Sequence, residues 1–189
     1  YEDVLRVSKD TESFYSRMST RPDSPPLPTI INMDDPDHRR RRSLVNKGLT
    51  PRRVQDHEPM IRAFCHALVD RVIEQGRCDF VRDIAAPLPM AVIGDLLGVE
   101  PEDRDMLLHW SDDLIAGTSI SAPPDVMDRA TQAFVQYADY NRRVVADRRA
   151  HPRDDMMSVL VHAEIDGRHL DDQDLLQEGL LILVGGDET

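Results

Sequence analysis

Residues 170–189 read Leu-Asp-Asp-Gln-Asp-Leu-Leu-Gln-Glu-Gly-Leu-Leu-Ile-Leu-Val-Gly-Gly-Asp-Glu-Thr, and this segment predicts a central helix. Asp171 can accept a hydrogen bond from a backbone N–H, so we expect it to cap the start of a helix. Leu170 and Leu175 are spaced to pack across that cap. Residues 180–184 are apolar on every side, which is typical of a helix that runs through the middle of a domain. The apolar run is too short to span a membrane.

Two glycines, Gly185 and Gly186, follow this run directly. A glycine inside a helix costs about 1 kcal/mol relative to alanine, so the pair indicates a specific requirement. One interpretation is the end of the helix, with a glycine in the left-handed conformation. The other is a flat ligand that lies against bare backbone, with the acid Glu188 and the hydroxyl of Thr189 just beyond it. This stretch alone leaves both interpretations open.

The composition limits the class of protein. The chain has 189 residues, enough for one domain with a core, and its 35 acidic and 23 basic residues give a net charge of −12. This charge argues against nonspecific binding to nucleic acid or to an anionic membrane. The sequence contains no signal-peptide pattern, and its two cysteines do not suggest a disulfide framework. We therefore expect a cytoplasmic protein with no nucleic-acid partner and no membrane span.

Apolar residues recur at helical spacing through most of the chain. The clearest pattern predicts a scaffold helix from Pro59 to Gly76, with an apolar stripe that includes Cys65. His57 and His66 lie near Cys65, but their spacing matches no familiar zinc site. The proline-rich residues 21–28 predict an extended loop that either borders a pocket or simply connects two elements. Further helices are expected over 1–7, 36–48, 87–98, 101–117, 124–149 and 156–163, with a small hairpin over 164–170.

A basic segment follows the proline-rich loop. Asp35 and Pro36 suit the start of a helix, as cap and first helical residue. His38 and Arg42 are four residues apart, so one helix face presents both and can hold a single anionic group. A solvated basic face or a nucleic-acid patch are the alternatives. The acidic residues directly beside the segment argue against the nucleic-acid patch.

Three motifs now stand in a fixed order: Met33-Asp-Asp-Pro-Asp-His-Arg-Arg-Arg-Arg42 with Thr50-Pro51, Ala86-Pro-Leu-Pro with Ile93-Gly-Asp-Leu-Leu-Gly-Val99, and Leu183-Val-Gly-Gly-Asp-Glu-Thr189. Together they resemble the bacterial cytochrome P450 family, the haem-thiolate monooxygenases. The resemblance implies a predominantly α, partial cytochrome P450 fold, from the B helix region through the middle of the central I helix, with at most a small β-hairpin. Residues 1–189 would then form one incomplete domain. Because the chain opens on Tyr1 and stops at Thr189 after a buried helix, we expect truncation at both ends.

The resemblance also implies roles for single residues. His38 and Arg42 match the positions that hold the propionates of haem b (heme, iron protoporphyrin IX). Gly185 and Gly186 match the positions against which haem and substrate lie. Glu188 and Thr189 match the catalytic acid and alcohol pair, which relays protons to oxygen; the hydroxyl can bond back to the carbonyl of Gly185.

The metal ligand of the family lies elsewhere. The axial cysteine sits in a loop beyond the central helix, after a Glu-x-x-Arg pair, and neither motif occurs in these residues. Cys65 and Cys78 do not match that loop. We therefore expect no metal ligand in this segment, and we expect the segment alone to be inactive as a haem-thiolate centre.

The family resemblance extends to substrate and partners. It implies a monooxygenase that inserts one oxygen atom of O2 into a lipophilic substrate, steroid or fatty-acid-like, as in actinobacterial members that oxidise steroid or lipid side chains. Electrons would come from NAD(P)H through a ferredoxin reductase and a ferredoxin, with Arg39 as a candidate contact. The alternative is an all-α, non-enzymatic ligand-binding or regulatory domain, which would bind no haem.

Overall fold

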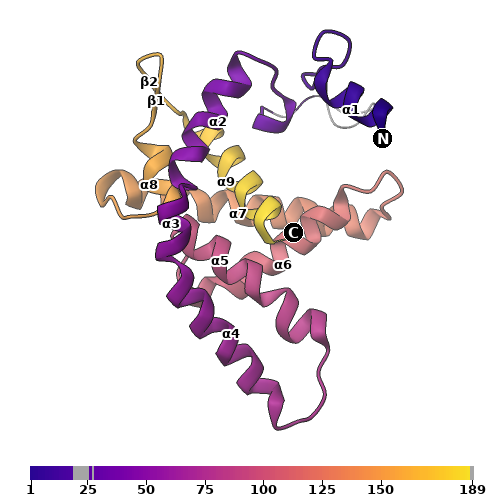
Figure 1. Cartoon of the computed structure of the whole chain (residues 1–189), viewed down its shortest axis with the longest axis vertical. Coiled ribbons are helices and arrows are strands. Elements are labelled where there is room, and N and C mark those ends of the chain that lie inside the picture. Colours follow the sequence, from indigo (N-terminus) through magenta and orange to yellow (C-terminus); the bar gives the residue numbers. More distant parts are fainter. Residues whose placement is uncertain (19–25, 27, 188–189) are drawn as a thin grey trace.

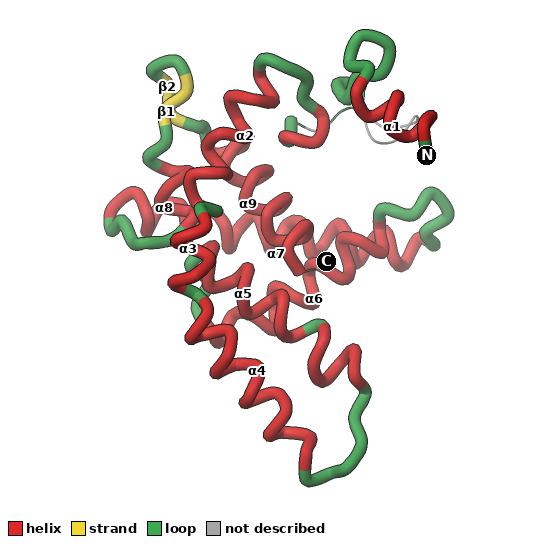
Figure 2. The backbone as a smooth tube through the Cα atoms, in the orientation of Figure 1, coloured by secondary structure: helices red, strands yellow, loops and turns green. Residues whose placement is uncertain are grey.

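A computed structural model describes residues 1–18, 26 and 28–187 of the chain. The described part is predominantly α-helical, with a single hairpin (Figures 1 and 2). In chain order the elements are α1 (Glu2–Lys9), η1 (Ile30–Asn32), α2 (Asp37–Gly48), α3 (Pro51–Asp56), α4 (Glu58–Ile73), the π-helical turn η2 (Val81–Ala85), α5 (Pro87–Leu97), η3 (Pro101–Asp103), α6 (Arg104–Gly117), α7 (Pro124–Ala150), α8 (Met156–Val161), β1 (Glu164–Ile165), β2 (Arg168–His169) and α9 (Asp172–Asp187). The predicted fold class, mostly helix with at most a small hairpin, is confirmed.

Helix α9 runs through the middle of the molecule and packs against α5, α6 and α7 (Figure 1). Its leucines Leu175 and Leu183 are completely buried, as the apolar run predicts. The predicted cap is confirmed, because the backbone N–H of Asp174 donates to Asp171 Oδ1 at 2.8 Å. The core around α9 also contains Leu44 from α2 and Leu160 from α8. Among the described residues, none of the helices is both long and apolar enough to cross a membrane.

The turns are largely those that the sequence predicts. Gly98 ends α5 in the left-handed conformation, with φ +76°. Asp166 and Gly167 have φ of +52° and +77° and join β1 to β2, so that Glu164 lies opposite His169. Two successive residues with positive φ are the requirement of the tightest hairpin turns. The small hairpin predicted over 164–170 is therefore confirmed.

The start of α2 differs from the prediction. The helix begins at Asp37, and Pro36 rather than Asp35 occupies the cap position. The Asp35 side chain does not cap the helix because Arg39 Nη2 donates to its carboxylate at 2.6 Å. The peptide bond between Asp35 and Pro36 is cis. The short helix α3, capped by Thr50, was not predicted.

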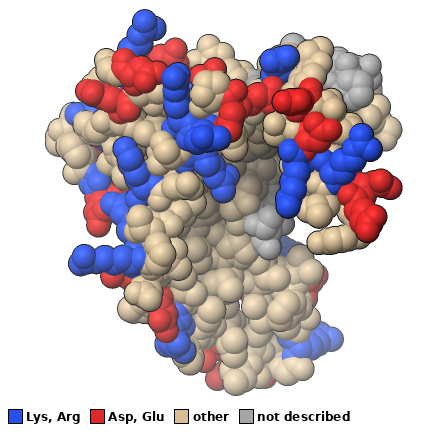
Figure 3. Space-filling view, turned by 45° about the horizontal axis from the view of Figure 1, so that its top comes forward, with Lys and Arg blue, Asp and Glu red and all other residues tan. Residues whose placement is uncertain are grey.

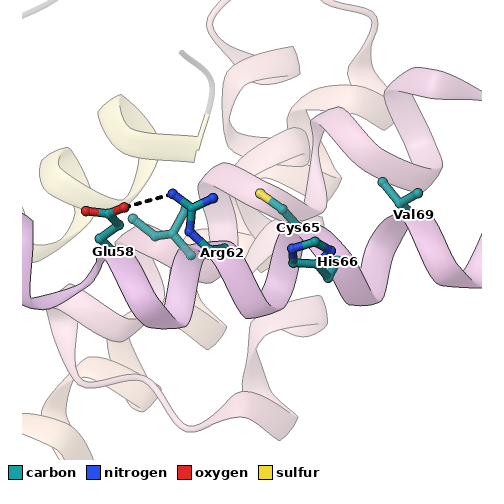
Figure 4. A pocket seen from close by; sticks show the side chains of 6 residues that line it. Glu58, Arg62, Cys65, His66 and Val69 are labelled. Carbon is teal, nitrogen blue, oxygen red and sulfur yellow. Dashed lines mark hydrogen bonds and ion pairs between the residues drawn. The ribbon is translucent and has the colours of Figure 1, made fainter.

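Helix α4 also differs from the prediction of a scaffold helix with a buried stripe. It extends away from the rest of the chain at one end of the molecule (Figure 1). Within α4 only Leu68 is buried, whereas Val69 and Ile73 are 44% and 65% exposed. A groove of about 490 Å3 follows this face; Figure 4 shows Cys65, His66 and Val69 along it, and Glu58 paired with Arg62.

Candidate active site

The glycine pair of α9 lies inside the helix, which continues to Asp187. The interpretation of the pair as a left-handed helix end is therefore wrong, and neither glycine has a positive φ. A Cβ at Gly186 would lie 2.5 Å from Cγ1 of Ile93, so glycine at this position lets α5 approach α9 closely. A Cβ at Gly185 would have no neighbour within 4 Å. A Cβ at Gly185 would thus have room, whereas a Cβ at Gly186 would meet a side chain of the protein.

The end of α9 is held by a neighbouring helix. Ser111 of α6 is completely buried, and its hydroxyl lies 3.1 Å from Oδ1 of the buried Asp187, to which it donates. The next two residues, the predicted catalytic pair Glu188 and Thr189, lie outside the described residues. The contact fixes the turn that directly precedes the pair.

The basic segment lies on α2, and its arginines differ in their partners. Arg39 pairs with Asp35, and Arg40 lies 3.1 Å from Asp166 in the hairpin turn. Arg41 pairs with Asp174 of α9. Arg42 is exposed, like Arg39 and Arg40. Unlike theirs, its side chain has no ion pair or hydrogen bond among the described residues. This guanidinium is therefore the one in the segment that the described protein leaves available for an anion.

His38 lies one helical turn before Arg42 and lines a cavity of about 570 Å3 between α1 and the start of α2. Asp34 and Asp35 line the same cavity, and His38 Nδ1 lies 3.8 Å from Asp35 Oδ1. The spacing that the sequence predicts for His38 and Arg42 is thus realised within a single helix, α2. Whether both bind one group stays a prediction.

A second cavity, of about 390 Å3, lies between η1, α6, α7 and α9. Most of its surface is apolar, and no charged side chain lines it among the described residues. Figure 3 shows a hollow on one face of the molecule, with charged side chains gathered along its upper rim. The lining residues are Thr29, Ile31, Asn32, Leu114, Ile115, Thr118, Phe134, Gln177, Leu180, Leu181 and Val184. Such a cavity suits a lipophilic molecule.

A buried carboxyl group on α9, Glu178, was not predicted. Its side chain is completely buried, and neither carboxylate oxygen has a hydrogen-bond partner. Burial raises the pKa of Glu178 to about 7; Arg41 lowers this pKa and Asp174 raises it further. Arg41 Nη2 donates to Asp174 at 2.7 Å, and Arg41 Nε lies 3.7 Å from Glu178. This ionic cluster joins α2 to α9 directly after Gln177, the first residue of α9 that lines the apolar cavity.

Two features of the site were missed from the sequence. Gln177 is a polar residue on the same face of α9 as Leu181 and Val184, so helical periodicity offers a signal for it. The Arg41–Glu178 contact joins residues 137 positions apart, and no local pattern indicates it.

No protein-family model matches the chain. Over its whole length the chain is 52% identical to a steroid C26-monooxygenase of Mycobacterium tuberculosis, of which it covers 51%. It is 35% identical to cytochrome P450 109 of Bacillus spizizenii and covers 46% of that protein. Among solved structures it is similar to CYP109E1 of Bacillus megaterium, substrate-free and with corticosterone, with TM-scores of 0.86 and 0.83. Both structures are 31% identical to the chain over all of it, and the chain covers 51% and 48% of them.

The chain therefore spans about half the length of the curated relatives and solved structures that it matches. The match spans the whole chain, and the described helices superpose on a solved structure with a TM-score of 0.86. The chain belongs to the cytochrome P450 family and forms part of the cytochrome P450 fold.

Proposed function

We propose that the full-length protein is a haem-dependent monooxygenase that inserts one atom of O2 into a lipophilic substrate. The observation that carries this proposal is the room beside the backbone of Gly185, where a Cβ would have no neighbour within 4 Å. Gly185 lies one turn after Leu181, and Leu181 lines the apolar cavity. A steroid is the favoured substrate class, because the 52% identical relative is named a steroid C26-monooxygenase. Residues 1–189 supply part of a single domain, which the rest of the full-length chain completes.

The described residues fit the periphery of a haem. The flat face of the group needs a surface without side chains, which Gly185 supplies. The propionates need cationic donors, and Arg42 is exposed and has no protein partner among the described residues, with His38 one turn away. The family resemblance places the axial cysteine in a loop beyond the central helix, so we assign the iron ligand to the rest of the full-length protein.

When bound, the haem supplies the activation of O2. The chain itself positions the reactants and handles protons. The apolar lining of the cavity excludes water from the lipophile, and Arg42 and His38 orient the haem through its carboxylates. Glu188 and Thr189 carry the proposed proton transfer, and the hydrogen bond from Ser111 to Asp187 fixes the turn before them.

Electrons are proposed to arrive from NAD(P)H through a ferredoxin reductase and a ferredoxin in the cytoplasm. Complementary charge steers docking, so an exposed cation on α2 suits an acidic partner. The side chain of Arg39 is 82% exposed, and its one ionic partner, Asp35, is itself half exposed. Arg39 is therefore the proposed ferredoxin contact.

Replacement of Arg42 tests the haem site. In the full-length protein, Arg42→Ala removes one charge-assisted contact, which is worth about 1.5–3 kcal/mol, so haem affinity should fall about 10- to 100-fold. The measurement is the rate and extent of haem transfer to an acceptor protein, with the carbon-monoxide difference spectrum as the report of thiolate ligation. The wild-type full-length protein should show the thiolate-type band, and residues 1–189 alone should not.

Arg39→Ala is the matched control, because it removes the same group from the same helix. It should leave haem affinity unchanged and slow the ferredoxin-supported reaction. Equal haem loss in both variants would contradict the role of Arg42. A full-length protein that binds lipids but no haem would instead favour a non-enzymatic ligand-binding domain.

A further inference from the structure

The side chain of Gln177 on α9 has no evident structural purpose. It is only 8% exposed and lines the apolar cavity, and none of the described residues hydrogen-bonds to it. An amide carries two donors and an acceptor. The Gln177 amide is not sealed inside the protein but opens into the cavity, where a bound ligand can reach it and supply a hydrogen-bond partner.

The cavity around Gln177 distinguishes between two kinds of lipophile. No lysine, arginine or histidine lines it among the described residues, so a carboxylate would be buried there without a counter-charge. A hydroxyl or ketone oxygen carries no charge and needs only one or two hydrogen bonds, which an amide can supply. Two hydroxyls, those of Thr29 and Thr118, also line the cavity, and that of Thr118 is already donated to the carbonyl of Ile115 at 2.7 Å.

The position of Gln177 along α9 sets a length. It precedes Gly185 by eight residues, which corresponds to about 12 Å at 1.5 Å per residue. Leu181 and Val184 lie between the two on the same helix face and line the same cavity. A ligand that touches Gln177 at one end and reaches the bare backbone of Gly185 at the other must be elongated and apolar in between.

We propose that Gln177 determines substrate specificity by hydrogen-bonding the single neutral oxygen of an elongated lipophile, a hydroxyl or a ketone, at the end opposite the carbon that is oxidised. A sterol or steroid ketone with an alkyl side chain has this form, whereas a fatty acid, with its terminal carboxylate, does not. The inference rests on the proposed function for the identity of the reacting end. It goes beyond that function in assigning the anchoring residue and in choosing between the steroid and fatty-acid classes.

A cycle of two proteins and two ligands tests the proposal. The full-length, haem-loaded protein and its Gln177→Leu variant are titrated with a steroid ketone that carries an alkyl side chain, and with the same skeleton without the oxygen. Binding is measured by calorimetry and by the optical shift of the haem. The wild type should prefer the ketone by about tenfold, and Gln177→Leu should abolish that preference.

Gln173→Leu is the matched control, because Gln173 is exposed on the same helix and does not line this cavity. It should keep the wild-type preference for the ketone. A ketone preference that survives in Gln177→Leu, or an equal loss of affinity for both ligands, would overturn the proposal. So would a fatty acid of similar length that binds the wild type as tightly as the ketone.

The proposed function can fail separately. Calorimetric binding requires neither electron transfer nor turnover. A ketone preference that depends on Gln177, in a protein that oxidises nothing, would support Gln177 as the anchor and refute the monooxygenase function. Oxidation of the steroid with a ketone preference that does not depend on Gln177 would support the monooxygenase function and refute the role of Gln177.

Discussion

At the scale of single residues, Glu178 is a buried acidic group whose carboxylate oxygens have no hydrogen-bond partner. Its carboxyl is fully buried, and burial raises its pKa to about 7, above the 4.5 of an exposed glutamate, although Arg41 lies 3.7 Å away. A carboxyl group with a raised pKa in the folded state binds a proton more tightly there than in the unfolded chain. Its contribution to stability is therefore complete below about pH 4.5 and is lost as the pH rises through about 7.

Replacement of Glu178 by glutamine should remove this pH dependence. Relative to wild type, full-length Glu178→Gln should gain stability between pH 4.5 and 7, by at most about 3 kcal/mol over the window. The measurement is the free energy of unfolding in urea at several pH values. Glu102→Gln, at an exposed position on η3, is the control and should follow the wild-type curve. A difference between Glu178→Gln and wild type that stays constant with pH would refute the raised pKa.

At the scale of elements, Arg148 joins three helices. It is 3% exposed near the end of α7, and its guanidinium donates to Asp155 at 2.6 Å and to the carbonyl of Gly98, which ends α5, at 2.7 Å. Asp155 in turn caps α8, because it accepts a hydrogen bond from the backbone N–H of Ser158 at 2.7 Å. The ends of α5 and α7 and the start of α8 thus share one buried ion pair.

Loss of the Arg148 cation should leave the buried carboxylate of Asp155 unpaired. We expect Arg148→Met to destabilise the full-length protein by about 3–5 kcal/mol, because Asp155 is left buried without a counter-charge. Addition of Asp155→Asn should recover part of the loss, since asparagine still caps α8. The neighbouring Arg149→Met is the control: its pair with Asp172 is exposed, so the change should be below about 1 kcal/mol. Equal effects of the two methionine variants in chemical denaturation would contradict this account.

The helices themselves were largely predictable, because their signals are local. Proline marks the starts of α5 and α7, Gly98 marks the end of α5, and Asp171 marks the start of α9. What the sequence could not show depends on contacts between distant segments. Examples are the packing of Ile93 against Gly186 and the burial of Glu178 beside Arg41. Of the candidate site, the spacing of His38 and Arg42 was predictable, whereas the orientation of Gln177 into a cavity required the structure.

At the scale of the whole molecule, α4 presents an apolar face without a described partner. Val69 and Ile73 are 44% and 65% exposed, and Cys65 lies on the same groove (Figure 4). A stripe of this kind at helical spacing is ordinarily packed against other elements. Since the chain spans about half the length of its relatives, we infer that the remaining part of the same polypeptide covers this face.

A comparison of two chain lengths tests this inference. Val69→Ser should destabilise the full-length protein by about 1–3 kcal/mol, because it removes apolar area from a packed contact. In residues 1–189 alone the same change should have little effect, because Val69 is half exposed there. Val135→Ser, at a similarly exposed position on α7, is the control and should affect both chains equally little. The same free-energy change for Val69→Ser in both chains would show that the face stays open.

The two adjacent glycines of α9 are constrained for different reasons. Gly186 is required by the fold, because any side chain would meet Ile93, whereas Gly185 has room for one. In a library selected only for folded protein, position 185 should therefore accept alanine and position 186 should not. In a library selected for turnover, both positions should stay restricted. The divergence between the two libraries would measure, at a single residue, how much of the sequence is maintained by the cofactor and not by the fold.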